Sequence, residues 1–512
     1  MSDVSAVSGP ATPGPTGQTG QTGQAGHLGE RRLTTIHAVG QSLAIGPMFS
    51  AGLLTGLIAS VAGFSTPLSV LLGTIGAVCL GYVISLFARR YAGAGAMYEY
   101  LVHGAHPLAG VFGAGIYGLG ILFLGGGGVF IANGFLAQTF LADIHIAVAW
   151  WIPSIVILAI AVGLNHLGVR VAIQGVLALA GISMIPFLIL AFTIIAKGGA
   201  HGNTLAVFGT GHSSLGSVFH GILFAVTLFI GFEAAASIGE EAREPHRAIP
   251  VALIGSVALA GLFFLLVTYA GAVGFGVKGS ATAWAADPSP MGALAQRYDG
   301  HWLSVLIDLV VMLDSISVAL AFTVAGSRVF FALGRDGLLP RFTTRLSRHD
   351  TPLGGNLVIV AAGALAIILG GVTTLGNLVK LPNNIEAFQI SAGIGSFLIE
   401  AVYAMLAVAA FRIIWSQWSG GARLWRLAVA VVGVATPVLA YYGSLNPFPP
   451  YPGDLSLIIA GACAVIVGLW LAYMRSRHPE RVAAAAKHAL EHHGVPPLDE
   501  SATFEPRPGL PM

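Results

Sequence analysis

Long apolar runs, separated by short polar clusters, occupy most of this 512-residue chain. A helix that crosses a membrane needs about 20 apolar residues in a row, because it must cover roughly 30 Å of hydrocarbon. Clusters of Gly, Pro and charged residues mark where each run ends. The pattern predicts twelve spanning helices, at residues 36–60, 66–88, 107–140, 147–165, 171–197, 217–240, 248–276, 302–333, 354–374, 385–412, 425–445 and 455–474.

The composition agrees with this pattern. Hydrophobic residues make up 55% of the chain and charged residues only 9%, whereas soluble proteins carry about 25% charged residues. A soluble globular enzyme is therefore excluded, and the net charge of +2 does not indicate a nucleic-acid surface. Residues 1–32 are rich in Gly, Pro, Thr and Gln and lack an apolar run, so we expect a disordered tail there and a second tail at 476–512.

The positions of Lys and Arg predict the orientation. Loops that stay in the cytoplasm are enriched in these residues. With twelve crossings that start inside, all but four of the 24 Lys and Arg residues fall on the cytoplasmic side. The exceptions are Lys197, Lys278, Arg297 and Lys380. We expect a multi-pass protein of the cytoplasmic membrane with both termini in the cytoplasm.

Two of the predicted helices carry an interruption near the middle. The first contains Gly46, Pro47 and Gly52, and the sixth contains Gly231 beside Glu233. The second interruption comes five helices after the first, and an odd repeat length of five turns the second copy upside down. Matched Gly/Pro interruptions in two inverted halves indicate the midplane binding site of a transporter. The alternative is that these residues serve close helix packing.

An interrupted helix has backbone N–H and carbonyl groups that can bind a ligand. Its freed N–H groups, at the positive end of a half-helix, suit a carboxylate. Its freed carbonyl groups suit an ammonium group or Na⁺, and both are tolerated in a membrane only where they line a cavity. The pair of interruptions therefore fits a zwitterion.

Several motifs resemble those of the amino acid, polyamine and organocation superfamily of secondary transporters. Residues 229–233 read Phe-Ile-Gly-Phe-Glu, and residues 240–250 follow the family's Glu-Glu-x-x-x-Pro-x-x-x-Ile-Pro pattern. Residues 335–340 read Arg-Asp-Gly-Leu-Leu-Pro, again as in the family, and 46–52 are similar to its Gly-x-Met-Ile-Gly-Ser-Gly segment. The resemblance covers about residues 33 to 475.

This resemblance implies an all-α polytopic membrane protein with a leucine-transporter-like fold that works by alternating access. The permease domain would span 33–475, with inverted five-helix repeats at 33–200 and 214–414 and two further helices at 424–475. The first and sixth helices would be broken.

The resemblance also implies a substrate site at the two breaks. Ser50, Ala51 and Gly52 would hold the carboxylate of a substrate. Its amino group would lie against backbone carbonyls, and two rings would gate it. The residues implied for these roles are Ile45, Gly46, Ile230 and Gly231 for the amino group, and Phe229 and Phe232 for the gate.

The chain departs from the family at three of these places. Ser-Ala-Gly replaces Gly-Ser-Gly, and Pro47 is unusual, which leaves amine substrates open. Ser183 stands where proton-coupled relatives carry a lysine. Coupling would then pass through Na⁺ held by carbonyls and hydroxyls, through a carboxylate that carries H⁺, or be absent.

Acidic residues within apolar runs are costly and are functional candidates. Glu233 would be a proton carrier or gate, or would cap freed backbone donors. Asp314, next to Ser315, would bind a cation or substrate ammonium, or form a structural hydrogen bond to a neighbouring helix. We expect Asp308 to be a solvated vestibule residue, and the sequence assigns no role to Glu400.

These observations predict a secondary active transporter of amino acids. An amine or polyamine carrier or exchanger is the main alternative, and a sensor that binds amino acids without transport is a further one. The chain shows neither a metal-binding nor a nucleophile motif, so we expect no enzyme activity and no cofactor beyond a coupling ion, H⁺ or Na⁺. The expected partners are a small-molecule substrate and the lipid bilayer, with the protein a monomer or homodimer. The sequence does not identify the substrate.

Overall fold

The computed structural model describes residues 33–43, 46–91, 93, 95–167, 169–287, 289–371, 374–375, 379–380, 384–480 and 482–484. Within these ranges the side chains of 169–182, 374–375 and 379–380 are not described. The predicted tails at 1–32 and 476–512 lie wholly or mostly outside the described residues, and Ile45 also lies outside them.

Helices make up most of the described residues in the first half. The short elements η2 and η4 are π-helical, whereas η3 and η5 are 3-10 helices. In chain order the elements are α1 (Thr35–Ser42), α2 (Pro47–Phe49), η2 (Ser50–Leu54), α3 (Thr55–Ala62), η3 (Gly63–Ser65), α4 (Thr66–Ala88), α5 (Met97–Gly104), α6 (Pro107–Ile121), η4 (Leu122–Gly128), α7 (Val129–Asp143), α8 (Trp151–Leu167), α9 (Val169–Ala196) and η5 (Leu205–Phe208).

The second half is built in the same way, with one two-stranded antiparallel hairpin formed by β1 and β2. Its elements are α10 (Leu215–Thr227), η6 (Phe232–Glu241), α11 (Pro245–Ala281), α12 (Ala283–Ala286), α13 (Pro290–Tyr298), α14 (His301–Arg335), η7 (Arg341–Thr344), α15 (Leu353–Gly371), β1 (Thr374–Leu375), β2 (Val379–Lys380), α16 (Asn384–Gln417), α17 (Gly420–Leu445) and α18 (Gly453–Arg477).

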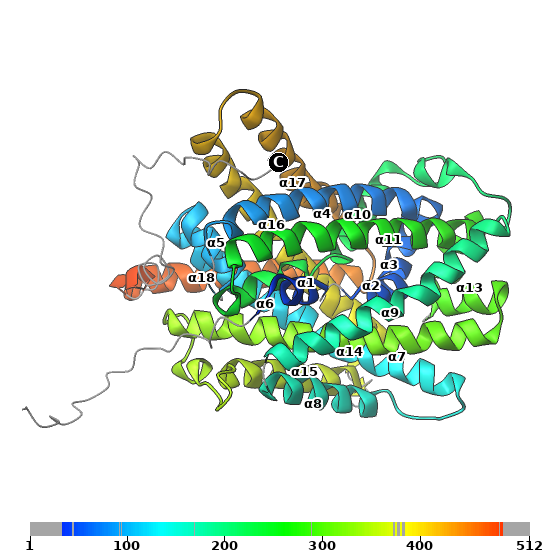
Figure 1. Ribbon diagram of the computed structural model, residues 1–512, viewed down its shortest axis with the longest axis horizontal. Coiled ribbons are helices and arrows are strands. Elements are labelled where there is room, and N and C mark those ends of the chain that lie inside the picture. The colour runs from blue at the N-terminus through cyan, green and yellow to red at the C-terminus, as the bar shows by residue number, and fades with distance from the viewer. Residues whose placement is uncertain are drawn as a thin grey trace, which may run out of the picture.

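The long helices run in broadly the same direction, as Figure 1 shows for α4, α11 and α14. Nine helical stretches of the described residues are long and apolar enough to span a membrane, and α8 and Ser183–Ala196 are shorter apolar helices. The first stretch, Thr35–Ala88, has 54 residues and turns at Gly63, where φ is +53°. An all-α membrane architecture is confirmed, whereas the count of twelve crossings stays a prediction.

Several predicted boundaries agree with the structure. Residues 66–88 were expected to form one helix and correspond to α4. The predicted end at 276 is where the backbone of α11 leaves helical geometry, because Gly276 has φ +73°. The short helices α5 and α13 were not predicted, since neither contains an apolar run of membrane length.

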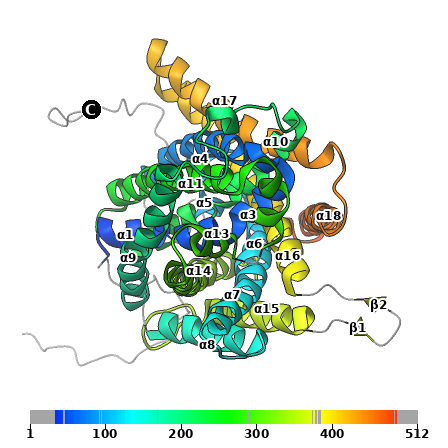
Figure 2. The same ribbon diagram turned by 90° about the vertical axis from the view of Figure 1, so that its right-hand side faces the viewer.

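Burial divides the helices into an inner and an outer set. Figure 2 looks along the bundle and places α14 inside it and α18 at its edge. Most of α14 from Ile307 to Gly334 is buried, as expected for a helix that is apolar on all sides. On α18, Ile466 and Leu469 are 62% and 66% exposed, so their apolar side chains are placed to contact lipid.

Candidate functional site

The chain turns sharply between α1 and α2. Gly46 has φ +58°, a left-handed conformation that glycine adopts without strain, and Pro47 opens α2. Pro47 has no N–H, and the N–H of Ser50 donates to the Gly46 carbonyl at 2.8 Å. Among the described residues, the N–H groups of Met48 and Phe49 therefore have no backbone partner at this half-helix start.

The carboxylate of Asp314 takes both of these donors. Its Oδ2 accepts from the N–H groups of Met48 and Phe49, each at 2.9 Å. Asp314 comes from the middle of α14, more than 260 residues away in sequence, and is only 1% exposed. Its contact matches the second of the two interpretations given above, a structural hydrogen bond to a neighbouring helix.

A second turn separates α10 from η6. Gly231 has φ +118°, and its N–H donates to Oε2 of Glu233 at 2.9 Å. The Tyr117 hydroxyl, on α6, donates to the other carboxylate oxygen at 3.3 Å. Glu233 is 2% exposed. It therefore caps a freed donor, as one of its two interpretations required, and a role in proton transfer stays a prediction.

The two turns are joined directly. The Ser42 hydroxyl, at the end of α1, donates to the Phe232 carbonyl at 2.8 Å. The amide of Gln41 donates to the Ala321 carbonyl of α14 at 3.2 Å. The fold thus brings the interruptions of the first and sixth predicted helices together and seats both against α14.

The residues implied for the substrate carboxylate lie one turn further along the same helix. Ser50, Ala51 and Gly52 are buried in η2. A Cβ added at Gly52 would lie 2.7 Å from Val311 Cγ2, so α14 packs closely there. Their role in substrate binding stays a prediction.

The residues implied for the gate are also buried. Phe229 packs edge-on against Phe264 with ring centroids 5.3 Å apart, and Phe232 lies 5.8 Å from Tyr403. Ile230 lies between these rings in sequence and is 3% exposed. The proposed gating role of both rings remains untested.

The serines discussed for coupling are both buried. Ser183 is buried in α9, and the Ser315 hydroxyl donates to the Met312 carbonyl of its own helix at 2.6 Å. Asp308 is 7% exposed and accepts a hydrogen bond from Ser289, so its expected solvation was wrong. No group of three His, Cys, Asp or Glu side chains suited to a metal occurs among the described residues.

A small cavity lies beside Glu233. Its volume of about 10 Å³ is close to the space that one water molecule needs. It is lined by Tyr117, Ile121, Gly231, Glu233, Ala234, Phe322 and Ala325. This cavity beside the Glu233 carboxyl group thus has room for about one water molecule.

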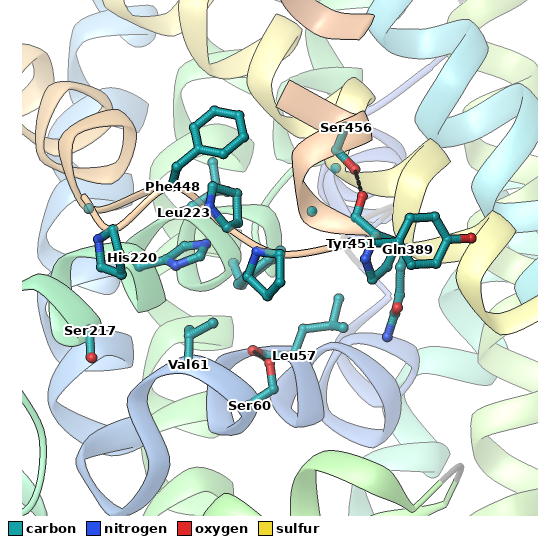
Figure 3. A pocket seen from close by; sticks show the side chains of 18 of the residues that line it. Leu57, Ser60, Val61, Ser217, His220, Leu223, Gln389, Phe448, Tyr451 and Ser456 are labelled. Atoms are coloured by element: carbon teal, nitrogen blue, oxygen red, sulfur yellow. Dashed lines mark hydrogen bonds between the residues drawn. The ribbon is translucent and has the colours of Figure 1, made fainter. Parts of the chain in front are cut away.

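A larger cavity, of about 500 Å³, lies beyond the break at the far end of α3. Figure 3 shows Leu57 and Val61 of α3 facing His220 of α10 across it, with Phe448 and Tyr451 of the α17–α18 connection above them. This volume is within the range of small-molecule pockets.

Ion pairs gather at the opposite end of the bundle. Arg328 of α14 pairs with Glu241 at 3.0 Å, and Arg335 pairs with Glu240 at 3.0 Å and approaches Glu99 at 3.9 Å. The start of α1 lies here too, since the Leu33 N–H donates to the Glu241 carbonyl at 3.0 Å. The pairing of Glu240 with the Arg-Asp-Gly turn agrees with the sequence, in which both belong to loops on the predicted cytoplasmic side.

Sequence reasoning passed over Glu99 and Tyr117. Glu99 accepts from the Gly95 N–H at 2.8 Å and is 1% exposed, at the N-terminal end of a helix that was not predicted. Burial, with Asp336 and Glu99 nearby, raises the pKa of the neighbouring Tyr98 phenol above its usual range. A polar side chain inside an apolar stretch was the available signal for both residues.

The buried carboxyl of Glu400 has a different environment. It lies on α16 and is fully buried, and neither carboxyl oxygen has a hydrogen-bond partner in the described part of the chain. The structure therefore assigns Glu400 a place in the bundle without a contact that identifies its role.

Comparison with known proteins gives consistent matches. A family model described as amino acid permease matches residues 39–474. The chain is 27% identical over 206 residues to the branched-chain amino acid permease BcaP of Lactococcus lactis subsp. cremoris, covering 38% of this chain and 43% of that protein. It is 26% identical over 381 residues to the cationic amino acid transporter 3, mitochondrial, of Arabidopsis thaliana, covering 68% of this chain and 60% of the relative. The chain thus matches less than two thirds of either relative's length.

A solved structure supports the fold. The crystal structure of MhsT in complex with L-phenylalanine superposes with a TM-score of 0.55 at 15% identity, covering 80% of this chain and 97% of that chain. This likeness confirms the leucine-transporter-like architecture that the motifs implied.

Proposed function

The chain belongs to the amino acid permease family, and on that premise we propose that it is a secondary active transporter that carries amino acids across the cytoplasmic membrane. In this proposal both termini lie in the cytoplasm, the protein is a monomer or homodimer, and a gradient of H⁺ or Na⁺ drives transport. Residues 33–200 and 214–414 would form the two inverted repeats that alternate between outward and inward access.

One observation carries this proposal beyond family membership. The left-handed turns at Gly46 and Gly231 meet at the same level of the bundle, joined by the Ser42–Phe232 hydrogen bond of 2.8 Å. Two helices broken at the same place release backbone donors and acceptors where a zwitterion can use both. Close packing alone would not require left-handed turns at both positions.

The arrangement of polar groups supports alternating access. The ion pairs of Arg328 and Arg335 hold the end of the bundle that we propose faces the cytoplasm. The 500 Å³ cavity lies towards the other end. When these ion pairs form, they hold α14 and η6 together and close this end of the bundle. When they separate, this end can open.

Uptake by purified protein in proteoliposomes tests the function. Labelled L-leucine, L-arginine, L-asparagine and putrescine are supplied under an imposed proton gradient, an imposed Na⁺ gradient or neither. We expect saturable amino acid uptake, and the gradient that raises it identifies the coupling ion. Uptake of putrescine alone would favour an amine carrier, and binding without flux under every gradient would indicate a sensor.

Gly52→Leu tests the site. A Cβ at this position would already lie 2.7 Å from Val311 Cγ2, so a leucine side chain must displace Val311 of α14. We expect uptake to fall at least about tenfold. Gly461→Leu is the matched control, because no atom lies within 4 Å of a Cβ there, on the outer helix α18. Equal uptake by both variants, at equal recovery of monodisperse protein, would contradict the site.

A further inference from the structure

The free donors at the helix break are already occupied in this structure. Residues Pro47 to Ala62 form one continuous helical run through α2, η2 and α3. At its start, the N–H groups of Met48 and Phe49 have no backbone partner among the described residues, and both donate to Asp314 Oδ2 at 2.9 Å. A carboxylate that binds at the start of this run meets this same pair of donors, because the next N–H, that of Ser50, already donates to the Gly46 carbonyl. This position lies just before Ser50, Ala51 and Gly52, where the family resemblance implied the substrate carboxylate.

The group that occupies the donors is chemically equivalent to the group expected from the substrate. Asp314 presents a carboxylate, is 1% exposed, and belongs to no ion pair within the described part of the chain. The two N–H groups and the positive end of the half-helix supply its compensation. A second carboxylate can accept from the same two N–H groups, so the substrate carboxylate and Asp314 would compete for them.

One face of α14 packs closely against the break. Val311, Asp314 and Val318 lie on one face of α14, at spacings of three and four residues. A Cβ at Gly46 would lie 2.0 Å from Val318 Cγ2 and 3.3 Å from Asp314 Oδ2. The face of α14 therefore rests directly on the break while Asp314 is seated.

We propose that Asp314 occupies the binding position of the substrate carboxylate. Its carboxylate accepts from the N–H groups of Met48 and Phe49 and closes the helix break, and the substrate carboxylate displaces it from these donors. This inference rests on the proposed function, since it assumes an amino acid substrate. Displacement of Asp314 breaks its hydrogen bonds between α14 and the break. Substrate binding is thereby coupled to the change between outward and inward access. A ligand without a carboxylate gains nothing from this exchange.

Binding to purified protein tests the proposal, with labelled L-leucine and L-arginine as probes and their decarboxylated forms, isopentylamine and agmatine, as comparisons. Asp314→Asn keeps the shape but weakens the bond to the two donors, because a neutral acceptor binds less strongly than a charged one. We expect Asp314→Asn to bind the amino acid about tenfold more tightly than the wild type does. Affinity for the amine should not change. Asp308→Asn, also on α14, is the control and should leave both affinities unchanged.

The wild-type protein provides a second measurement that does not depend on a variant. Carbodiimide modification of Asp314, measured by mass spectrometry, should increase when the amino acid is present, because displacement exposes the carboxyl group. Modification of Asp308 should stay the same.

Other outcomes overturn the proposal. Weaker amino acid binding by Asp314→Asn, with protection of Asp314 by substrate, would show that Asp314 pairs with the substrate ammonium group. Unchanged affinity and unchanged modification would show a purely structural cap. A wild-type protein that binds neither amino acid would overturn the proposed function and this inference with it. If the wild-type protein binds an amino acid but Asp314 gives one of the two results just described, only the inference is overturned.

Discussion

Two glycines determine where the two interrupted helices leave helical geometry. Gly46 has φ +58° and Gly231 has φ +118°, in the region that residues with a Cβ rarely adopt. Each turn releases N–H groups inside the bundle, and each is capped by one carboxylate, Asp314 or Glu233. At the residue scale the site is thus a pair of left-handed turns, each with its own acid.

Gly46→Ala should destabilise the protein. Alanine in the left-handed conformation costs about 1–2 kcal/mol, and its Cβ would lie 2.0 Å from Val318 Cγ2. We expect a lower midpoint of thermal unfolding in detergent, measured by fluorimetry. Gly255→Ala is the matched control, because no atom lies within 4 Å of a Cβ there and alanine favours its helix, α11. A Gly46→Ala variant as stable as this control would contradict the strain assigned to the turn.

Buried ion pairs connect whole elements. Arg328 is fully buried on α14 and pairs at 3.0 Å with Glu241, whose side chain is 7% exposed at the end of η6. Arg335 adds the pair with Glu240, on the same two elements. The half-helix after the Gly231 turn is therefore held to α14 by charge as well as by packing. Burial makes each of these pairs sensitive to the loss of one partner.

Glu241→Gln should reveal this sensitivity. It leaves the Arg328 guanidinium buried without its counter-charge, which costs about 3–5 kcal/mol in comparable pairs. We expect a clear fall in the thermal midpoint and recovery of most of it in Glu241→Gln/Arg328→Met, which removes both charges. Glu244→Gln, at an exposed position nearby, should have no effect. A double variant no more stable than the single one would show that the pair does not act as a unit.

The whole molecule is a bundle with different ends. Ion pairs and the start of α1 occupy one end, and the 500 Å³ cavity lies towards the other. The distribution of Lys and Arg predicts that the first of these ends faces the cytoplasm. The orientation of the chain in the membrane follows from this difference and is open to direct measurement.

Cysteine labelling checks the orientation. In a Cys79→Ser/Cys463→Ser background, His301→Cys and Arg348→Cys place single thiols at exposed positions on either side of α14. We expect a membrane-impermeant maleimide to label His301→Cys in intact cells. Arg348→Cys should react only after permeabilisation. Equal labelling of both thiols in intact cells would contradict the predicted topology.

The pattern of apolar runs predicted much of the architecture. Residues 66–88 correspond to α4, and the predicted end at 276 coincides with the left-handed turn at Gly276. The prediction succeeds because hydrocarbon leaves a spanning backbone no alternative to internal hydrogen bonds, so length and polarity mark each helix. It fails for α5 and α13, since short helices outside the hydrocarbon are not subject to this constraint.

The sequence by itself determined the all-α membrane class, the family and the glycines at which two helices are interrupted, because each depends on local residue types. It also identified Glu233 and Asp314 as acids in apolar surroundings. Only the tertiary structure decided which donors these acids meet. Asp314 lies 266 residues from Met48 in the chain, and no local pattern encodes a contact over that distance. The packing of α14 across the break brings them to 2.9 Å.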